Sequence, residues 1–194
     1  MRLLIIRHGD PDYEHDTLTP RGEKEAELLA GWLSSCRIQK AYVSPLGRAK
    51  RTADIALQGS DIPREECGWL REFCPPLIHR PDLGEPDGKT IIWDWFPRDW
   101  SVVPEFYDVN HWCDTPEMQE GKVRPAYEEV IRGLDALLAS HGYVHSSEGN
   151  YYTVTESIHD TICFFCHFGV ECLLLSRMTG ISPMLLWHGF CGAP

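Results

Sequence analysis

Residues 2–9 read RLLIIRHG, a run of four apolar residues between two arginines that ends in a histidine and a glycine. The apolar residues Leu3 to Ile6 show no polar alternation, which is typical of a strand buried on both faces of a parallel sheet. The polar residues after this run then lie at the carboxyl end of a strand, where ligands gather in open α/β sheets. This one stretch therefore indicates both the class of fold and the place of a ligand site.

Strand and helix patterns alternate outward from this stretch. Thr19-Pro20 is typical of a helix start, and apolar residues at i, i+3, i+4 and i+7 extend that helix to about residue 35. The alternation predicts an α/β fold with a mostly parallel sheet. The further predicted elements are a strand over 40–43, a helix over 46–57, a helix over 125–140, a polar connection over 142–150, a central strand over 161–166, a turn over 167–169, a helix over 170–178 and a last strand over 184–187.

An irregular segment interrupts the pattern over residues 73–122. It is rich in proline and holds four of the seven tryptophans. We interpret it as an inserted cap within a single domain over 1–194, whose catalytic core covers about 1–72 and 123–194. The tryptophans of the cap serve its own packing at least as readily as they serve a substrate.

The charge balance limits the partners of this chain. Its 18 Lys and Arg residues stand against 29 Asp and Glu residues, which gives a net charge of −11. Nucleic-acid binding needs clustered cations, so we expect no nucleic-acid partner. The longest apolar stretch, 161–175, is short for a bilayer crossing and contains His167 and Glu171. We therefore expect no membrane partner and a cytoplasmic location.

The eight cysteines are expected to be mostly reduced, because a chain of 194 residues can fold without disulfides. Cys163 and Cys166 have CxxC spacing but lie in an apolar run, where free cysteine behaves as a small hydrophobe. We interpret this pair as buried strand residues rather than as a metal or redox site.

Cationic side chains follow three of the predicted strands. Arg7-His8-Gly9 comes after the first strand, Ser44 to Arg48 links the second strand to its helix, and His167 comes after the central strand. Helix starts near Leu46 and Gly169 add backbone N–H groups at the same edge of the sheet. These groups predict one cationic pocket in an acidic protein, and the ligand that suits this pocket is a phosphate group.

Five sequence blocks follow one another along the chain: Arg7-His8-Gly9, Leu18-Thr19-Pro20-Arg21-Gly22, Ser44-Pro45-Leu46-Gly47-Arg48-Ala49 with Thr52-Ala53, Leu70-Arg71-Glu72, and His167. Together they resemble the histidine phosphatase superfamily, the family of phosphoglycerate mutases and related phosphatases, in which such blocks occur in the same order. The resemblance implies a phosphoglycerate mutase-like three-layer sandwich with a mostly parallel central sheet flanked by helices.

The resemblance also implies roles for individual residues. His8 would be the nucleophile that forms a phosphohistidine, which requires a neutral ring with one free lone pair. Arg7, Arg48 and His167 would bind the phosphoryl oxygens. Glu72 would be the general acid, with Asp10 as the rival candidate. Gly9 and Asp10 would also line the substrate site, and the mechanism uses neither metal nor cofactor.

The chain departs from the family pattern at three points. Asp10-Pro11 follows the first histidine motif, where relatives usually have Glu, and Phe168-Gly169 follows the second histidine in place of a small pair. Cys74-Pro75-Pro76-Leu77 stands where relatives usually have a Gly-x-Trp-Glu-Gly-like turn. Arg51, one turn beyond Arg48, is assigned to the surface or to the rim of the pocket.

We predict a metal-independent phosphatase that hydrolyses a small-molecule phosphomonoester through His8. A phosphoglycerate mutase-type transferase and a non-catalytic phosphate-binding module of the same fold are the alternatives. A zinc-binding structural protein that uses Cys163, Cys166 and His167 is a further alternative. A homodimer is also left open.

Overall fold

The computed structural model describes residues 1–74, 78–79, 89–155 and 159–190. Packing divides the chain into two compact units, one of Met1–Glu72 with Glu156–Glu171 and one of Phe73–Thr155 with Cys172–Pro194. The first boundary falls where the predicted insert begins, and the single-domain organisation stays a prediction. Within the described ranges, no helix is both long and apolar enough to cross a bilayer.

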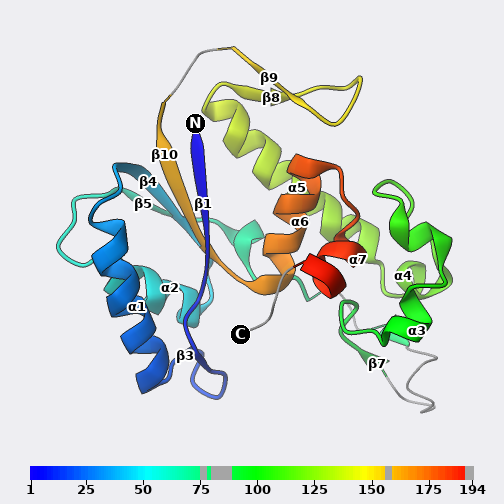
Figure 1. The fold of residues 1–194 in the computed structure, drawn as a ribbon, viewed down its shortest axis with the longest axis horizontal. Coiled ribbons are helices and arrows are strands. Elements are labelled where there is room, and N and C mark those ends of the chain that lie inside the picture. Colours follow the sequence, from blue (N-terminus) through cyan, green and yellow to red (C-terminus); the bar gives the residue numbers. More distant parts are fainter. Residues whose placement is uncertain (75–77, 80–88, 156–158, 191–194) are drawn as a thin grey trace. The chain divides into compact units, whose positions relative to one another are not determined.

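A parallel sheet of four strands forms the centre of the first unit. Figure 1 shows β1 (blue) beside β10 (orange), although they come from distant parts of the chain. The prediction of a mostly parallel central sheet flanked by helices is confirmed. In spatial order the strands are β1 (Arg2–Arg7), β10 (Thr161–Cys166), β4 (Ile38–Val43) and β5 (Arg64–Glu66).

The central strand β10 is buried on both faces, as its unbroken apolar sequence predicts. Cys163 and Phe165 point to one face and pack in the core cluster that includes residues of β4. Phe164 points to the other face, where its ring lies 5.8 Å from that of Tyr42 and 6.1 Å from that of Trp69. This double burial fixes the position of the residues that follow β10.

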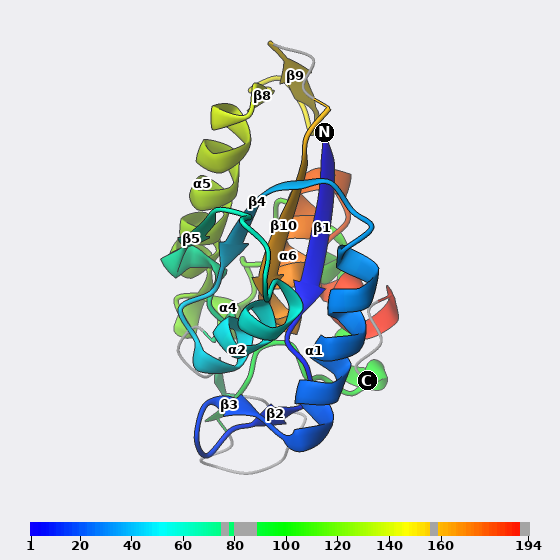
Figure 2. The ribbon, with the colours of Figure 1, turned by 90° about the vertical axis from the view of Figure 1, so that its left-hand side faces the viewer.

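Two helices cover one face of this sheet. α1 (Pro20–Leu33) begins at Thr19, whose hydroxyl oxygen accepts a hydrogen bond from the Gly22 N–H, so the predicted cap is present. α2 (Gly47–Ala56) follows β4 directly. Figure 2 shows both helices beside the strands, and Leu33, Ala53 and Ala56 join the core cluster. A short hairpin of β2 (Pro11–Asp12) and β3 (Thr17–Leu18) links β1 to α1.

The second unit contains longer helices and short irregular elements. α5 (Val123–Ser140) confirms the predicted helix over 125–140, and the part of α6 (Phe168–Thr179) from Cys172 onward also belongs here. The hairpin of β8 (Tyr143–His145) and β9 (Tyr152–Val154) follows α5. The remaining elements are β6 (Ile78–His79), β7 (Lys89–Thr90), α3 (Pro97–Trp100), η3 (Pro104–Tyr107), α4 (Pro116–Glu120), α7 (Pro183–Leu185) and η4 (Leu186–Phe190), while η1 (Gly68–Leu70) belongs to the first unit.

Aromatic side chains of the predicted insert pack within the second unit. Trp112 is 1% exposed and meets the ring of Trp187 edge-on at 5.5 Å. Phe73 stacks on the same Trp187 at 6.0 Å, and Trp95 meets Phe106 at 5.4 Å. These aromatic residues therefore build the core of their own unit, which is the packing role that the sequence allowed for them.

Three local predictions are wrong. The segment over 184–187 is helical rather than a strand, because Ser182-Pro183 starts a helix and a short apolar run fits either structure. The connection over 142–150 contains β8, whose three residues are too few to show a periodicity. The predicted turn over 167–169 is instead the start of α6, which begins at Phe168.

Candidate active site

Strand register brings the two motif histidines together. In the pairing of β1 with β10, Arg7 lies opposite Cys166, so the next residues along the two strands are His8 and His167. The His8 backbone N–H donates to the Cys166 carbonyl at 3.1 Å, and the two imidazole rings lie 5.1 Å apart. The predicted convergence of residues far apart in the sequence is thus present at the carboxyl edge of the sheet.

His8 is held as a neutral imidazole with one nitrogen available. It is 7% exposed, and its Nδ1 lies 2.8 Å from the carbonyl oxygen of Gly9, so Nδ1 carries the proton and donates it. Burial lowers the pKa of His8, and the charges of Arg48 and Arg7 lower it further, against the opposing effects of the Gly9 carbonyl and Asp16. Nε2 therefore keeps its lone pair at neutral pH, as a nucleophile requires.

His167 is fully buried and also neutral. Its Nε2 lies 2.7 Å from the hydroxyl of Ser44, which itself accepts from the Leu46 N–H. Burial lowers the pKa of His167 to about 2, assisted by the charges of Arg48 and His8. We assign the Ser44 hydroxyl as the donor and His167 Nε2 as the acceptor of this hydrogen bond. The ring proton of His167 then lies on Nδ1, which is a donor.

Buried donors without partners surround His8. Four of the six buried side-chain N or O atoms that lack a hydrogen-bond partner within the described residues belong to this cluster. Leaving such a donor unsatisfied costs about 1–3 kcal/mol, whereas an oxyanion would supply acceptors. The four atoms are Arg7 Nε, Arg7 Nη1, Arg48 Nε and His167 Nδ1.

Two contacts hold the guanidinium groups of this cluster. The ring of Phe168 lies under Arg7, with its centroid 5.5 Å from the arginine Cζ. Arg48 lies in the first turn of α2, where its side chain is 11% exposed and its Nη1 donates to Asp16 at 2.8 Å. A cation at a helix start is unfavourable for the helix dipole, which favours a ligand role for Arg48 over a structural one.

The two candidate acids have different surroundings. Glu72 is half-buried after η1, and its charge raises the pKa values of Cys166 and Glu171, so it lies toward the end of β10. The carboxylate of Asp10 instead accepts from the Thr19 hydroxyl at 2.5 Å, at the start of α1. These contacts favour Glu72, whose role as general acid stays a prediction.

Gly9 has a packing role in addition to the substrate contact predicted for it. A Cβ at Gly9 would lie 2.7 Å from the carbonyl oxygen of Gly22, so only glycine allows this approach to α1. Its N–H donates to the Thr52 hydroxyl at 3.1 Å. Thr52 in turn donates to the Arg48 carbonyl, which connects the histidine motif to α2.

Sequence reasoning missed three polar residues of this region. Asp16 lies in a hairpin turn with no periodic signal, and Ser44 was identified only as part of a block. Glu171 lies four residues after His167 on α6, a helical spacing that could have drawn attention to it. Burial raises the pKa of Glu171, and Glu72 adds to that effect while Arg7 opposes it.

Other predicted groups lie outside the cluster. Arg51 pairs with Glu23 and is 46% exposed, which confirms its surface assignment. Cys163 and Cys166 are buried strand residues, as interpreted, and the positions i and i+3 place their side chains on opposite faces of β10. No disulfide joins the seven cysteines that the structure describes, and Cys191 lies outside the described residues. Within the described ranges, no three His, Cys, Asp or Glu residues form a metal-ligand group.

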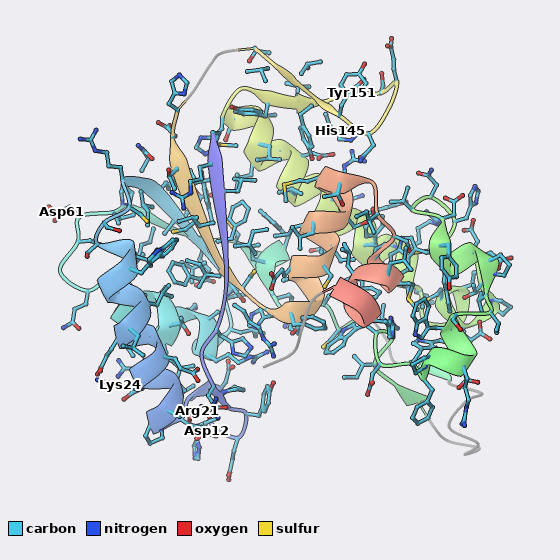
Figure 3. The ribbon with its side chains drawn as sticks, viewed as in Figure 1. Asp12, Arg21, Lys24, Asp61, His145 and Tyr151 are labelled. Carbon is cyan, nitrogen blue, oxygen red and sulfur yellow. The ribbon has the colours of Figure 1, made fainter. Side chains whose placement is uncertain are left out.

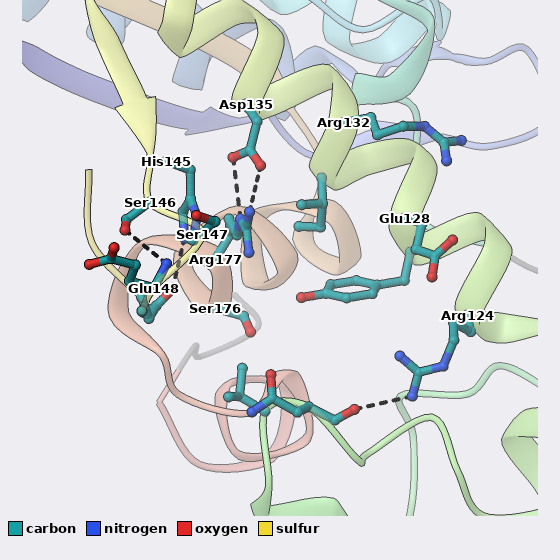
Figure 4. Close-up of a pocket in the computed structure, with 16 residues that line it drawn as sticks. Arg124, Glu128, Arg132, Asp135, His145, Ser146, Ser147, Glu148, Ser176 and Arg177 are labelled. Atoms are coloured by element: carbon teal, nitrogen blue, oxygen red, sulfur yellow. Dashed lines mark hydrogen bonds and ion pairs between the residues drawn. The ribbon is translucent and has the colours of Figure 1, made fainter. Parts of the chain in front are cut away.

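A cavity of about 690 Å³ lies in the second unit and contains none of the predicted site residues. Figure 4 shows it between α5, the β8–β9 connection and α6. Within its wall, Arg177 donates from Nε and Nη2 to the two carboxylate oxygens of Asp135. Its lining charges are mixed in sign, so it does not resemble the donor cluster around His8.

Comparisons with known proteins agree with this geometry. A family model described as "Histidine phosphatase superfamily (branch 1)" matches residues 3–147. An adenosylcobalamin/alpha-ribazole phosphatase of Salmonella typhi is 24% identical over 97% of this chain and 84% of its own length. A 2,3-bisphosphoglycerate-dependent phosphoglycerate mutase of Cytophaga hutchinsonii is 28% identical over 72% of this chain and 71% of its own. The structure of a phosphoserine phosphatase from Entamoeba histolytica superposes with a TM-score of 0.57 at 16% identity, over 98% of this chain and 85% of the other.

Proposed function

The chain belongs to the histidine phosphatase superfamily, and we propose that it is a metal-independent phosphatase that hydrolyses small phosphomonoesters through a phosphohistidine at His8. The observation that carries this proposal is a neutral His8 beside four buried donor atoms without partners in the described residues. A phosphoryl group offers several acceptor oxygens at once, which suits such a set of donors.

Binding comes first in the proposed reaction. Arg7 and Arg48 donate from their unpartnered nitrogens to the phosphoryl oxygens, and His167 donates from Nδ1. These donors are in place before the substrate arrives, so they stabilise the charge of the transition state without reorganisation. Because His167 stays neutral, it binds as a hydrogen-bond donor rather than as a second cation.

His8 then attacks phosphorus. The Nε2 lone pair forms the N–P bond while the bond from phosphorus to the ester oxygen breaks. The imidazole gains positive charge in this step, and the Gly9 carbonyl that accepts from Nδ1 stabilises it. The same contact orients the ring, so attack requires no change of tautomer.

Glu72 is proposed to act as the general acid for the leaving group and then as the general base for water. Its acid form gives a proton to the departing oxygen, and its carboxylate then takes a proton from the water that attacks the phosphohistidine. That attack breaks the N–P bond, releases inorganic phosphate and returns His8 to its neutral form. Burial raises the pKa of the neighbouring Glu171, and Glu72 adds to that effect, so the surroundings of this pair disfavour carboxylate charge.

Phosphoglycerate mutase chemistry is the second candidate, and the similarity to the Cytophaga hutchinsonii mutase is the observation that favours it. A mutase would use the same nucleophile but would return the phosphoryl group to the substrate. Isomerisation of phosphoglycerate faster than release of phosphate would identify this activity.

The other parts of the proposal concern substrate and location. The net charge of −11 supports a small phosphomonoester rather than nucleic acid as the substrate. The lack of a disulfide among the seven described cysteines supports a reducing compartment, such as the cytoplasm.

Hydrolysis of p-nitrophenyl phosphate in the presence of EDTA tests the proposal. We expect turnover that EDTA does not reduce, inhibition by vanadate, and no activity in His8→Ala. His111→Ala is the matched control, because this histidine is exposed, pairs with Asp114 and belongs to the second unit. Full turnover by His8→Ala would refute the proposed nucleophile.

A further inference from the structure

We propose that Asp16 is a positioning residue that aims Arg48 at the phosphoryl group, an inference that rests on the function proposed above. Asp16 lies in the turn of the β2–β3 hairpin and makes two hydrogen bonds to the start of α2. Its Oδ2 accepts from the Gly47 backbone N–H at 2.6 Å, and its Oδ1 accepts from Arg48 Nη1 at 2.8 Å. One carboxylate thus fixes both the helix start and the side chain that extends from it.

The backbone is arranged at some cost to make this contact. Asp16 has a φ of 47°, a left-handed conformation that is uncommon for residues other than glycine. On the other side, a Cβ at Gly47 would lie 2.0 Å from the Asp16 carbonyl oxygen, so only glycine permits the approach. Strained backbone of this kind persists where the surrounding structure holds it, and it is concentrated at functional sites.

The ionised carboxylate is maintained by its two donors. Burial acts to raise the pKa of Asp16, but the Gly47 N–H and the Arg48 guanidinium outweigh it and the pKa is lowered. The negative charge also opposes the lowering of the pKa values of His8 and His167, so its field reaches both rings. Asp16 therefore acts on the donor cluster without belonging to it.

Two contacts fix the Arg48 guanidinium and leave its Nε atom available to a ligand. Asp16 engages Nη1, and the ring of Tyr13 from the same hairpin lies 5.4 Å from Cζ. The Nε atom is buried and has no partner within the described part of the chain. A free arginine side chain loses rotamer entropy when a ligand fixes it, and because Asp16 already fixes Arg48, that loss occurs before substrate binds.

If Asp16 positions Arg48, its loss should affect binding of a transition-state analogue more than binding of a ground-state anion. Phosphate binds through its charge, which a misaligned Arg48 still attracts. Vanadate adopts the five-coordinate geometry of the transition state, and its binding requires the guanidinium in its place. Removal of Asp16 should therefore weaken vanadate binding much more than phosphate binding.

The test is Asp16→Asn, with Asp12→Asn as its matched control. The asparagine can still accept from the Gly47 N–H and tolerates the left-handed backbone, so the fold is retained. Asp12 lies in the same hairpin (Figure 3), and Asp12→Asn removes the same negative charge as Asp16→Asn. The Asp12 carboxylate, however, accepts hydrogen bonds from Glu14 and His15 rather than from Arg48. Calorimetric affinities for phosphate and vanadate are compared in wild type and both variants.

We expect Asp16→Asn to weaken vanadate binding by about 10-fold or more and phosphate binding by less than about 3-fold, in line with the cost of a displaced binding group. Asp12→Asn should change neither affinity. Tighter binding of both anions by Asp16→Asn would show that Asp16 competes with the ligand, and an equal effect of the two variants would show a general charge effect. Either result overturns the proposal.

Hydrolysis and anion binding by the wild type, measured separately, distinguish failure of this inference from failure of the proposed function. If wild type binds vanadate but hydrolyses nothing, the phosphatase proposal fails while the Asp16 comparison still gives its answer from binding alone. If wild type hydrolyses phosphomonoesters and Asp16→Asn binds vanadate as wild type does, only the positioning role is refuted.

Discussion

Arg7 and Arg48 of the first unit differ from the arginines of the second unit in how completely their nitrogens are paired. In the second unit, Arg177 gives two nitrogens to Asp135, and Arg124 donates to Asp114. In the first unit, Arg7 and Arg48 keep buried nitrogens that no described residue satisfies. Buried donors without a partner are uncommon, so the buried unpartnered nitrogens of Arg7 and Arg48 indicate a ligand, whereas the fully engaged Arg177 indicates a structural role.

The largest expected effect is a difference in kcat/KM between alanine variants of two arginines on α2. Arg48→Ala should lower kcat/KM for p-nitrophenyl phosphate by about 100-fold or more, the usual cost of losing one preorganised donor to a transition state. Arg51→Ala, one turn further on, should stay within about 3-fold, since its side chain is exposed and pairs with Glu23. Steady-state kinetics of the two variants measure this contrast, and equal losses would break it.

The free energy of unfolding should depend on pH because His167 is neutral in the folded protein. The pKa of His167 is about 2 in the folded state, below its ordinary value of 6.5, so the unfolded chain takes up the proton first as pH falls. This contribution to stability is complete above pH 6.5 and is lost as the pH falls from there toward 2. The slope for one such group is at most about 1.4 kcal/mol per pH unit.

Urea unfolding between pH 7 and pH 5 measures that slope in wild type and in His167→Gln. We expect a shallower slope for the variant, whatever its stability at pH 7. The same slope in both proteins would mean that His167 is free to ionise in the folded state, contrary to its complete burial beside two arginines.

A smaller effect is expected in the second unit, and on stability rather than catalysis. Arg177→Ala removes the cationic partner of Asp135, which keeps its hydrogen bond from the Tyr152 hydroxyl, and both side chains of the ion pair are about three-quarters buried. The free energy of unfolding should fall by about 1–2 kcal/mol, between the values for exposed and for buried ion pairs. Turnover per folded molecule should not change. A loss of kcat with unchanged stability would assign this arginine to catalysis and remove the contrast between the units.

The first unit could be predicted well from sequence because its signals are local and its geometry follows from register. The apolar runs of β1 and β10 identify buried strands, and parallel pairing then places His8 beside His167. The edge strand β5 was missed because its residues Arg64, Glu65 and Glu66 are charged and exposed, so they carry no apolar pattern.

Contacts between short polar segments could not be predicted in the same way. Asp16 meets Gly47 across 31 residues, through a turn whose backbone conformation no periodicity encodes. The C-terminal apolar run was assigned to a strand because four residues suit either structure, and packing around Trp187 decided for a helix. In the second unit, proline and tryptophan content indicated irregular structure but not its arrangement.

The most direct test of the account is the stereochemistry of phosphoryl transfer. The measurement is transfer of an isotopically chiral phosphoryl group from a phosphomonoester to an acceptor alcohol, followed by determination of the configuration at phosphorus. Passage through His8 involves two in-line displacements, and the account predicts retention of configuration. Inversion would show a single direct displacement and would contradict a nucleophilic His8.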